Sequence, residues 1–432
     1  MDVEEFVKAE EIADLLKEII KVESVGKLET KVAEIIIDRL EKEGITSYKL
    51  IESEEGRGNL IIEIDGGAGE GYNLMIVGHS DVVPAGKNWS VDPFGGIERD
   101  GYIYGRGAID DKGQVAVMTY LAILLKRMNF KFRGKLKLLI AADEETQMPE
   151  HGVRFLMKNH PEIFKDVDGA IGELGGRVDF GGKKGQMIIF GEKSYATFKI
   201  TFRGPGGHSS QPYRTRNPII DASRYINSLP DGYFFISKPV KIMLRKLFGL
   251  KSLFLTNKLF NKLVLKTVKN EKIAKLLHSY THVTIAKTIL RAGEKDNVIP
   301  DHAELYVNMR GFPELDAKDL EKILLKYMPK GIDFEIKNEK FVESTYSDIK
   351  DRLYKAIEKT VKEMGYEPFP IIMSATSDSV WLRKMGIPVF HIFTTKRILE
   401  WDRVHGVDER IHKEDLIEAL KGYLYLIKNL SK

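Results

Sequence analysis

The chain of 432 residues contains no cysteine. The absence of thiols excludes disulfides, thiolate metal sites and a cysteine nucleophile, so a metal ion would have to be held by histidine, aspartate and glutamate. No stretch reaches the roughly 18 consecutive apolar residues of a membrane-spanning helix. The first 24 residues are acidic and amphipathic, with no basic segment followed by an apolar core. We therefore expect no signal peptide and a cytoplasmic location.

A large excess of charge of one sign is also absent. The 67 Lys and Arg residues nearly balance the 63 Asp and Glu residues, and the net charge of +4 predicts no nucleic-acid partner. The glycine-rich stretch 104–113 lacks both the Gly-Lys-Ser/Thr ending of a P-loop and the glycine pattern of a dinucleotide-binding turn. No G-x-S-x-G motif is present, so a serine hydrolase lacks its usual nucleophile turn.

The length favours two domains, and the hydrophobic pattern indicates how they are arranged. Helix-like and strand-like segments alternate at both ends of the chain, which predicts an α/β domain with a helix-covered, largely parallel sheet. Helices are predicted at residues 3–20, 29–42, 114–128, 348–364, 379–385 and 413–430. Strands are predicted at residues 59–64, 73–77, 135–141, 169–171, 186–191 and 388–392.

The middle of the chain follows another pattern. Its predicted elements have the order β-α-β-β-α-β, which is the ferredoxin-like arrangement of a small α+β domain. They are strands at 195–202, 283–290, 303–309 and 333–336, with helices at 217–228 and 317–328. We therefore expect residues 194–342 to be inserted in a discontinuous domain formed by residues 1–193 and 343–432.

A basic segment, residues 233–280, interrupts this order. Between residues 238 and 277 it has eleven Lys and Arg and one acid, Glu271, among Leu, Phe, Val and Ile. A single helical face is predicted from the three- and four-residue steps between Lys258, Lys262, Lys266, Lys269, Lys272 and Lys275. Such a helix can lie on an anionic membrane or guide an acidic ligand. We favour the alternative, a solvated basic face on a helix that packs its leucines against the small domain or a second subunit.

Polar residues follow the apolar run 74–77 at the end of a predicted strand. His79 and Asp81 are two positions apart, so on a strand their side chains leave on the same side. This spacing suits a histidine that binds a metal and a carboxylate that orients its ring. The alternative is an ordinary polar strand end.

Further acids end other apolar runs, namely Asp143, Glu144, Glu145, Glu173, Asp378 and, beside His405, Asp408 and Glu409. Taken alone, each of these acids could be an ordinary solvent-exposed loop residue. If they converge on one sheet edge, they form an oxygen and nitrogen metal site, and two zinc ions bridged by a carboxylate would use that many ligands.

Several motifs occur in an order that resembles the dinuclear-zinc peptidase family of succinyl-diaminopimelate desuccinylase, acetylornithine deacetylase and glutamate carboxypeptidase. The motifs are GHSDVVPAG, YGRGAIDDKG, ADEET, GELGG, GPGGHSSQPYRTRNPI, NVIPD, ATSDS and HGVDE, and they extend over nearly the whole chain. The basic segment has no counterpart in this resemblance. The inserted domain would serve as a lid and as the dimerisation surface of a homodimer.

The resemblance implies roles for ten residues. The resemblance implies two divalent metal ions, most simply zinc, with cobalt or manganese as alternatives. Their ligands would be His79, Asp110, Glu145, Glu173 and His405, with Asp110 bridging the two ions. Asp81 would hold the ring of His79, and Glu144 would be the general base. His208, supplied across the dimer interface, would stabilise the oxyanion. Arg310 and Asn297 would contact the substrate carboxylate and the surroundings of the reacting carbonyl.

The expected activity is that of a metal-dependent amidohydrolase. Two cations facing these ligands leave a net positive site that favours a bound hydroxide near neutral pH. The substrate would be a small N-acyl amino acid, as in a deacylase or desuccinylase, or a peptide that loses its C-terminal residue. A glutamate at position 173 leans, by resemblance, toward deacylases and carboxypeptidases. The alternatives are a dipeptidase on the same scaffold and a non-catalytic binding protein.

Overall fold

The computed structural model describes residues 8–146, 149–180 and 182–432. Contacts divide the described chain into two compact units. The first unit comprises residues up to 190 with 347–371 and 377–432, and the second comprises 191–346 and 372–376. The unit boundaries at 190/191 and 346/347 lie near the predicted ones at 193/194 and 342/343. The assignment of the units as catalytic and lid domains stays a prediction.

The first unit contains a mixed sheet in the order β1-β2-β6-β3-β7-β18-β9-β17, with β8 beside β9. Its centre is parallel, because β3 pairs in parallel with both β6 and β7, and β18 pairs in parallel with β7. Outside this centre, β2 pairs antiparallel with β1 and β6, and β9 pairs antiparallel with β18 and β8. The short link from β1 to β2 cannot form a parallel crossover. The strands are β1 (Tyr48–Glu52), β2 (Gly58–Asp65), β3 (Leu74–His79), β6 (Lys135–Ala141), β7 (Gly169–Gly172), β8 (Arg177–Phe180), β9 (Lys183–Glu192), β17 (Pro368–Met373) and β18 (Val389–His391).

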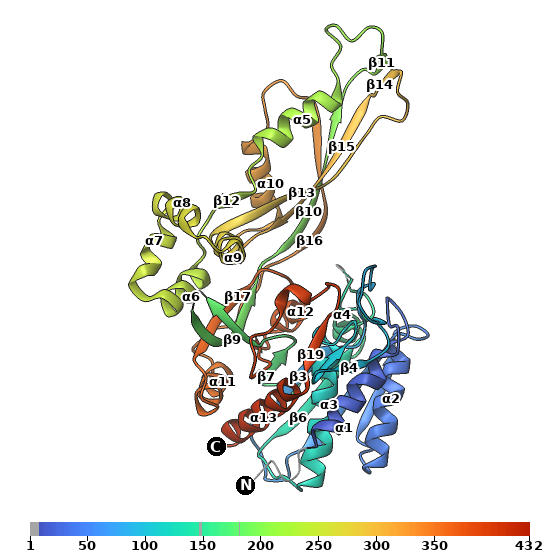
Figure 1. Ribbon diagram of the computed structural model, residues 1–432, viewed down its shortest axis with the longest axis vertical. Coiled ribbons are helices and arrows are strands. Elements are labelled where there is room, and N and C mark those ends of the chain that lie inside the picture. The colour runs from blue at the N-terminus through green and yellow to red at the C-terminus, as the bar shows by residue number, and fades with distance from the viewer. Residues whose placement is uncertain (1–7, 147–148, 181) are drawn as a thin grey trace. The chain divides into compact units, whose positions relative to one another are not determined.

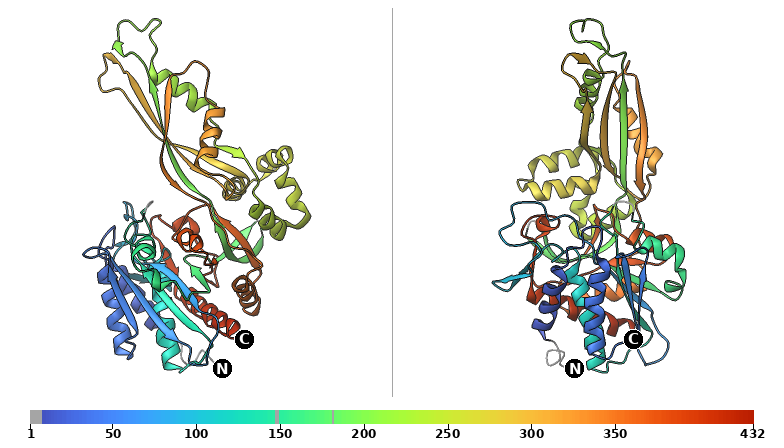
Figure 2. Two further views of the ribbon diagram at one scale, coloured as in Figure 1. Left: turned by 180° about the vertical axis from the view of Figure 1, so that it is seen from behind. Right: turned by 90° about the vertical axis from the view of Figure 1, so that its right-hand side faces the viewer.

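Helices cover this sheet, as the sequence predicts. Helix α3 is buried nearly all round and contacts α1, α2, α13 and strand β3. Figures 1 and 2 show α1, α2 and α3 side by side. The helices are α1 (Ala9–Ile20), α2 (Glu29–Lys42), α3 (Lys112–Arg127), α4 (Val153–Asn159), α11 (Arg352–Glu363), α12 (Ser379–Lys384) and α13 (Lys413–Leu430). The predicted start of the first helix at residue 3 lies outside the described residues.

The second unit has the predicted β-α-β-β-α-β order. Its antiparallel sheet runs β12-β13-β15-β10-β16, and helices α5 and α10 lie against it. Asn217 begins α5 by accepting a hydrogen bond from the N–H of Ile219, with Pro218 in the first turn. The elements are β10 (Tyr195–Arg203), β11 (Gly207–His208), α5 (Pro218–Ser228), β12 (Gly232–Phe234), β13 (His282–Ala292), β14 (Val298–Ile299), β15 (His302–Arg310), α10 (Ala317–Lys326) and β16 (Phe334–Val342).

The basic segment forms four short α-helices, and the prediction of one continuous lysine face is wrong. They are α6 (Lys238–Phe248), α7 (Ser252–Thr256), α8 (Lys258–Thr267) and α9 (Glu271–Thr281). The break falls at residues 268–270, where the side chain of Asn270 accepts the N–H of Ile273 and starts a new helix. The expected packing of leucines holds for α6, for α9 and for Leu255 of α7, whereas Leu253 of α7 and Leu259 and Leu263 of α8 are exposed.

Within the described residues, no helix is both long enough and apolar enough to cross a membrane. The expected cytoplasmic location stays a prediction.

Candidate metal centre

Three neighbouring parallel strands deliver side chains to one edge of the first unit's sheet. His79 is the last residue of β3 and lies opposite Ala141, the last residue of β6. Asp143, Glu144 and Glu145 follow β6, and Glu173 follows β7 directly. Because parallel strands end at the same edge, these groups meet without any long-range loop.

Two loops that are distant in the sequence complete the cluster. Strand β5 (Tyr102–Tyr104) precedes the loop that carries Asp110, and β19 (Arg410–His412) follows the loop that carries His405. These strands pair antiparallel, with Arg410 opposite Tyr104. The pairing brings the loops 105–111 and 405–409 together across about 300 residues of chain.

The five predicted ligands lie together around Asp110. One oxygen of this carboxylate, Oδ1, lies 3.2 Å from Nε2 of His79, and the other, Oδ2, lies 3.1 Å from Nε2 of His405. The same His79 nitrogen lies 3.1 Å from Oε2 of Glu173. The same His405 nitrogen lies 3.1 Å from Oε1 of Glu145. Asp110 therefore separates two donor groups, each with one imidazole and one further carboxylate.

The tautomer of His79 follows from its other ring nitrogen. Nδ1 lies 3.0 Å from the backbone oxygen of Asp81 and 3.4 Å from Oδ1 of the same residue. If Nδ1 carries the proton and donates it there, the lone pair of Nε2 points at Asp110 and Glu173. A lone pair in this position is available to bind a metal ion placed between the two carboxylates.

The pKa shifts within the cluster are consistent with this role. Hydrogen bonds with Asp110 and Glu145 raise the pKa of His405 to about 10. Burial raises the pKa of Glu145 to about 7, against the lowering effect of His405. The site therefore attracts positive charge, supplied by protons or by metal ions. Hard carboxylate oxygens with imidazole nitrogens are a ligand set that suits zinc and related divalent ions.

Asp81 has more contacts than the sequence predicts. Besides facing the ring of His79, its Oδ1 and Oδ2 accept hydrogen bonds from the N–H groups of Glu144 and Glu145, at 3.1 and 3.0 Å. One buried carboxylate thus positions a candidate ligand on each of two strands. Burial and the nearby Glu173 raise the pKa of Glu144, which favours proton binding by this carboxylate.

A buried ion pair holds the loop after β6. Asp143 has a left-handed backbone, with φ of 61°. Its Oδ1 lies 2.7 Å from Nη2 of Arg57, and its Oδ2 accepts the N–H groups of Glu150 and His151. Arg57 also lies 2.9 Å from Oε1 of the buried Glu29. This network places Glu144 and Glu145 toward the cluster.

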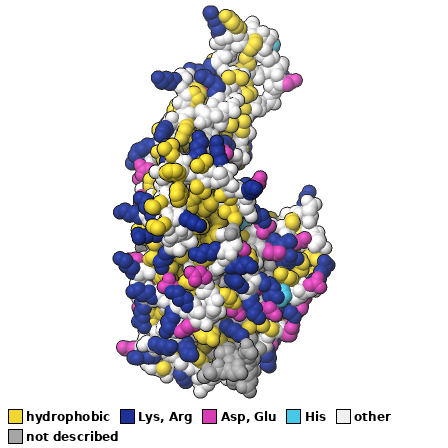
Figure 3. All heavy atoms as spheres, turned by 60° about the vertical axis from the view of Figure 1, so that its left-hand side comes forward, with side chains coloured by type: hydrophobic (Ala, Val, Ile, Leu, Met, Phe, Trp, Pro, Cys, Tyr) yellow, Lys and Arg dark blue, Asp and Glu magenta, His cyan; other side chains and the backbone are white. Residues whose placement is uncertain are grey.

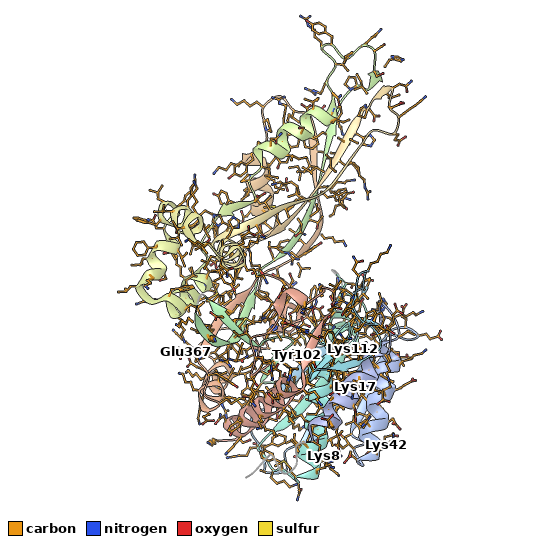
Figure 4. All side chains as sticks on the ribbon, viewed as in Figure 1. Lys8, Lys17, Lys42, Tyr102, Lys112 and Glu367 are labelled. Atoms are coloured by element: carbon orange, nitrogen blue, oxygen red, sulfur yellow. The ribbon has the colours of Figure 1, made fainter. Side chains whose placement is uncertain are left out.

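Lys112 anchors the other side of the cluster, at the start of α3. Its side chain is buried, and Nζ donates hydrogen bonds to the carbonyls of Ile19 and Val22 at 3.0 and 2.7 Å. Figure 4 labels this residue on the ribbon. The anchor ties the loop with Asp110 to the end of α1.

Sequence reasoning missed Asp111 and His391 at this site and named Asp378 without giving it a role. Asp111 accepts the backbone N–H of His79 at 3.2 Å and, with His79 and Glu173, forms a second set of donors within 4.8 Å. Asp378 is buried, and neither of its carboxylate oxygens has a hydrogen-bond partner among the described residues. His391 approaches the backbone oxygen of Glu173 at 2.5 Å. Asp111 and Asp378 belong to the motifs DDKG and ATSDS, so the sequence offered them as candidates. His391 belongs to none of the motifs, and no pattern in the sequence pointed to it.

The other three predicted residues belong to the second unit. His208 and Asn297 are close, because β11 pairs with β14 and the carbonyl of Asn297 accepts the N–H of Ser209. Arg310 ends β15, and its Nη1 donates to Oγ1 of Thr376 at 3.1 Å. Its guanidinium carbon lies 4.5 Å from the ring centroid of Tyr195. Their parts in catalysis stay predictions.

Comparisons with known proteins show which family the chain belongs to. The pattern of "Peptidase family M20/M25/M40" matches residues 75–429. A succinyl-diaminopimelate desuccinylase of Wolinella succinogenes is 27% identical over 426 residues, covering 96% of this chain and 98% of the relative.

Two solved structures share the fold. An M20 family metallo-carboxypeptidase of Sulfolobus solfataricus matches with a TM-score of 0.74 at 22% identity, covering 98% of this chain and 99% of the other. A dinuclear metal binding peptidase of Bacillus subtilis matches with a TM-score of 0.61 at 18% identity, covering 98% of each chain. Since the family pattern extends over most of the sequence and encloses the whole donor cluster, this chain is a metallohydrolase of peptidase family M20/M25/M40.

Proposed function

We propose that this chain is a two-metal amidohydrolase that removes the acyl group from a small N-acyl amino acid, as a desuccinylase does. The observation that carries the proposal is the placement of Asp110, whose two oxygens face two different histidines. The desuccinylase relative supports the substrate class, and the dinuclear metal binding peptidase supports two ions.

In this proposal, His79, Asp110 and Glu173 hold one divalent ion, and His405, Asp110 and Glu145 hold the other. When bound, the ions would polarise the scissile carbonyl and lower the pKa of a water molecule, and zinc fits the donor chemistry. Asp81 keeps the ring of His79 in the tautomer that the ligand role needs.

Glu144 is the proposed general base. Its carboxylate takes a proton from the attacking water as the oxygen bonds to the amide carbon, and then gives that proton to the departing amine nitrogen as the C–N bond breaks. The carboxylate holds the proton between the two steps. The backbone of Glu144 is fixed by Asp81, which limits misplacement of the carboxylate.

The second unit would supply substrate recognition. Arg310 offers a guanidinium for bidentate binding of a carboxylate, and Asn297 lies near His208 in the β11–β14 pair. We propose that His208 donates a hydrogen bond to the oxyanion from the other copy of a homodimer. The ring of His208 is exposed, and its Nδ1 lies 2.7 Å from Oγ of Ser210.

The test is a hydrolysis screen of N-succinyl and N-acetyl amino acids and dipeptides, with zinc, cobalt or manganese added. We expect turnover of an N-acyl amino acid, and none of the dipeptides. Turnover that requires a free α-amine would favour a dipeptidase instead.

The variant Glu144→Gln separates catalysis from metal binding. We expect its turnover to fall by about a thousandfold or more while it still binds two equivalents of metal, because the lost group moves protons without binding metal. Glu150→Gln, an exposed glutamate of the same loop, serves as the control and should remain active. Undiminished turnover in Glu144→Gln would contradict the proposed mechanism.

A further inference from the structure

The basic segment presents one sign of charge to solvent. All eleven Lys and Arg residues between 238 and 277 are exposed, and the one acid, Glu271, lies 3.5 Å from Lys275. The basic residues are Lys238, Lys241, Arg245, Lys246, Lys251, Lys258, Lys262, Lys266, Lys269, Lys272 and Lys275. This density contrasts with the nearly balanced charge of the chain as a whole.

Large apolar side chains are exposed within the same segment. The most exposed are Leu250 and Leu259, both at 83% exposure, followed by Leu253, Leu263, Phe254 and Phe260 at 65% to 49%. Figure 3 shows apolar side chains gathered among basic ones on this side of the molecule. We call the helix pair α7–α8, from Ser252 to Thr267, the apolar hairpin.

The packing of the apolar hairpin shows that Leu253, Leu259 and Leu263 are not part of a core, whereas Leu255 is buried. The single buried residue of α8 is Asn261, whose side-chain amide donates to the carbonyl of Leu255 at 2.9 Å. Phe254 and Phe260 contact each other edge-to-face, with ring centroids 5.5 Å apart. Adjacent helix α6 buries most of its apolar residues, although its Ile242 is exposed. A contiguous exposed apolar surface of this kind marks an interaction site.

The basic residues around the hairpin indicate which kind of partner can bind this surface. A second copy that met this face through twofold symmetry would place the same basic residues against each other, which is repulsive. Single-stranded nucleic acid would engage stacking aromatics and hydrogen bonds, whereas most of the protruding side chains here are leucines. An anionic bilayer satisfies both features, because its hydrocarbon accepts Leu and Phe and its phosphates attract Lys and Arg.

We propose that the apolar hairpin docks on an anionic phospholipid bilayer. Its Leu253, Leu259 and Leu263 enter the interface, together with Leu250 just before it. The surrounding lysines bind lipid phosphates. The attachment is reversible and depends on salt, since an interfacial helix pair does not span the bilayer. This inference is independent of the proposed hydrolytic function, because it involves none of the residues of the metal centre.

The experiment is co-sedimentation of the full chain with phosphatidylglycerol vesicles and with phosphatidylcholine vesicles at low ionic strength. We expect binding to phosphatidylglycerol only, with release at about 0.5 M NaCl, where charges are screened within a few ångströms. Absence of sedimentation with phosphatidylglycerol, or equal sedimentation with both lipids, would overturn the proposal.

Two sets of variants test the two features separately. Lys258→Glu with Lys262→Glu and Lys266→Glu should weaken partitioning by about a hundredfold or more. The control for charge is Lys31→Glu with Lys158→Glu and Lys165→Glu, three exposed lysines of the first unit, which should bind nearly as the parent does. A control that weakens binding equally would show adsorption by net charge alone and would overturn the proposal.

Leu259→Ser with Leu263→Ser should weaken partitioning by about tenfold or more without changing charge. Both leucines are exposed, so thermal unfolding should stay close to that of the parent. Unchanged vesicle binding by this variant would contradict the proposal that these leucines enter the bilayer interface. If the parent is instead an oligomer that these serines dissociate, while vesicle binding is absent, the occupant is a second copy and the proposal is wrong.

Discussion

Arg106 and Glu409 form a buried ion pair that joins the loop of Asp110 to the loop of His405. Nη1 of Arg106 lies 2.5 Å from Oε2 of Glu409, and both side chains are almost fully buried. Oε1 of Glu409 accepts the N–H groups of Ile109 and Asp110 at 2.8 and 3.0 Å. Arg106 in turn donates to the carbonyl of His405 at 3.1 Å. The pair therefore sets the separation of two candidate ligands without contacting substrate.

We expect Glu409→Gln to weaken metal binding by about 10- to 100-fold, because its amide has only one acceptor oxygen. Its NH2 group would face either Arg106 and the N–H of Gly107 or the N–H groups of Ile109 and Asp110, all of which are donors. It should also destabilise the fold by about 3–5 kcal/mol, since the guanidinium stays buried without its counter-charge. Chelator competition and denaturant unfolding measure the two effects.

A matched control is Glu18→Gln, which removes the partner of Arg39 in an exposed ion pair of 2.8 Å. Its effect on unfolding should stay within about 1 kcal/mol. If Glu409→Gln behaves like this control, the buried pair has no positioning role.

The bridging position of Asp110 predicts a difference in metal stoichiometry. Asp110→Asn should lower the affinity for both metal ions, because both candidate donor groups share this carboxylate. Glu145→Gln should lower the affinity for only one of the two metal ions, by more than about tenfold, since the Glu145 carboxylate faces only the donor group that contains His405. Calorimetric titration with zinc distinguishes the patterns, and equal behaviour of the two variants would contradict the bridge.

The proposed supply of His208 by the other copy predicts subunit complementation. His208→Ala and Glu144→Gln should each be nearly inactive alone. A one-to-one mixture that exchanges subunits should recover about a quarter of the parent activity, because half of the dimers contain one intact composite site. If His208 acts within its own subunit, the mixture stays inactive. A chain that is monomeric and fully active would rule out both arrangements.

The stacked pair of His278 and His282 predicts acid sensitivity of the second unit. The ring centroids are 4.1 Å apart, and Nζ of Lys193 donates to the carbonyl of His282 at 2.8 Å. Burial, with added repulsion from His278, lowers the pKa of His282 to about 4. The unfolded chain then binds more protons than the folded one between about pH 6.5 and pH 4, so stability falls as the pH drops through this window.

His282→Gln should flatten this dependence, because its side chain does not titrate. The difference between unfolding temperatures at pH 7 and pH 4.5 should be smaller than in the parent. His302→Gln, at an exposed position of the same unit, is the control and should retain the parent profile. Parallel profiles for His282→Gln and the parent would contradict the assignment.

Much of the fold could be predicted because it depends on short stretches of sequence. The apolar run before His79 predicted a buried strand, and β3 is buried throughout. The order of elements from residue 195 to 336 also predicted the small α+β arrangement. The lysine steps misled the prediction, because periodicity continues through Asn270, where a side-chain cap starts a new helix. The sequence also did not predict the antiparallel pairs of this sheet, since pairing direction depends on which strands become neighbours.

By itself, the sequence determined the chemistry available to this protein. Without thiols, the donors had to be histidines and carboxylates, and the resemblance of their motifs to a known family singled out His79 and His405. Only the tertiary structure decided how they meet. The two oxygens of Asp110 face two histidines because β5 pairs with β19 and Arg106 pairs with Glu409 across distant segments. Likewise, the leucines of α8 are exposed because of how α6 to α9 pack, and amphipathic spacing alone cannot distinguish a covered face from an open one.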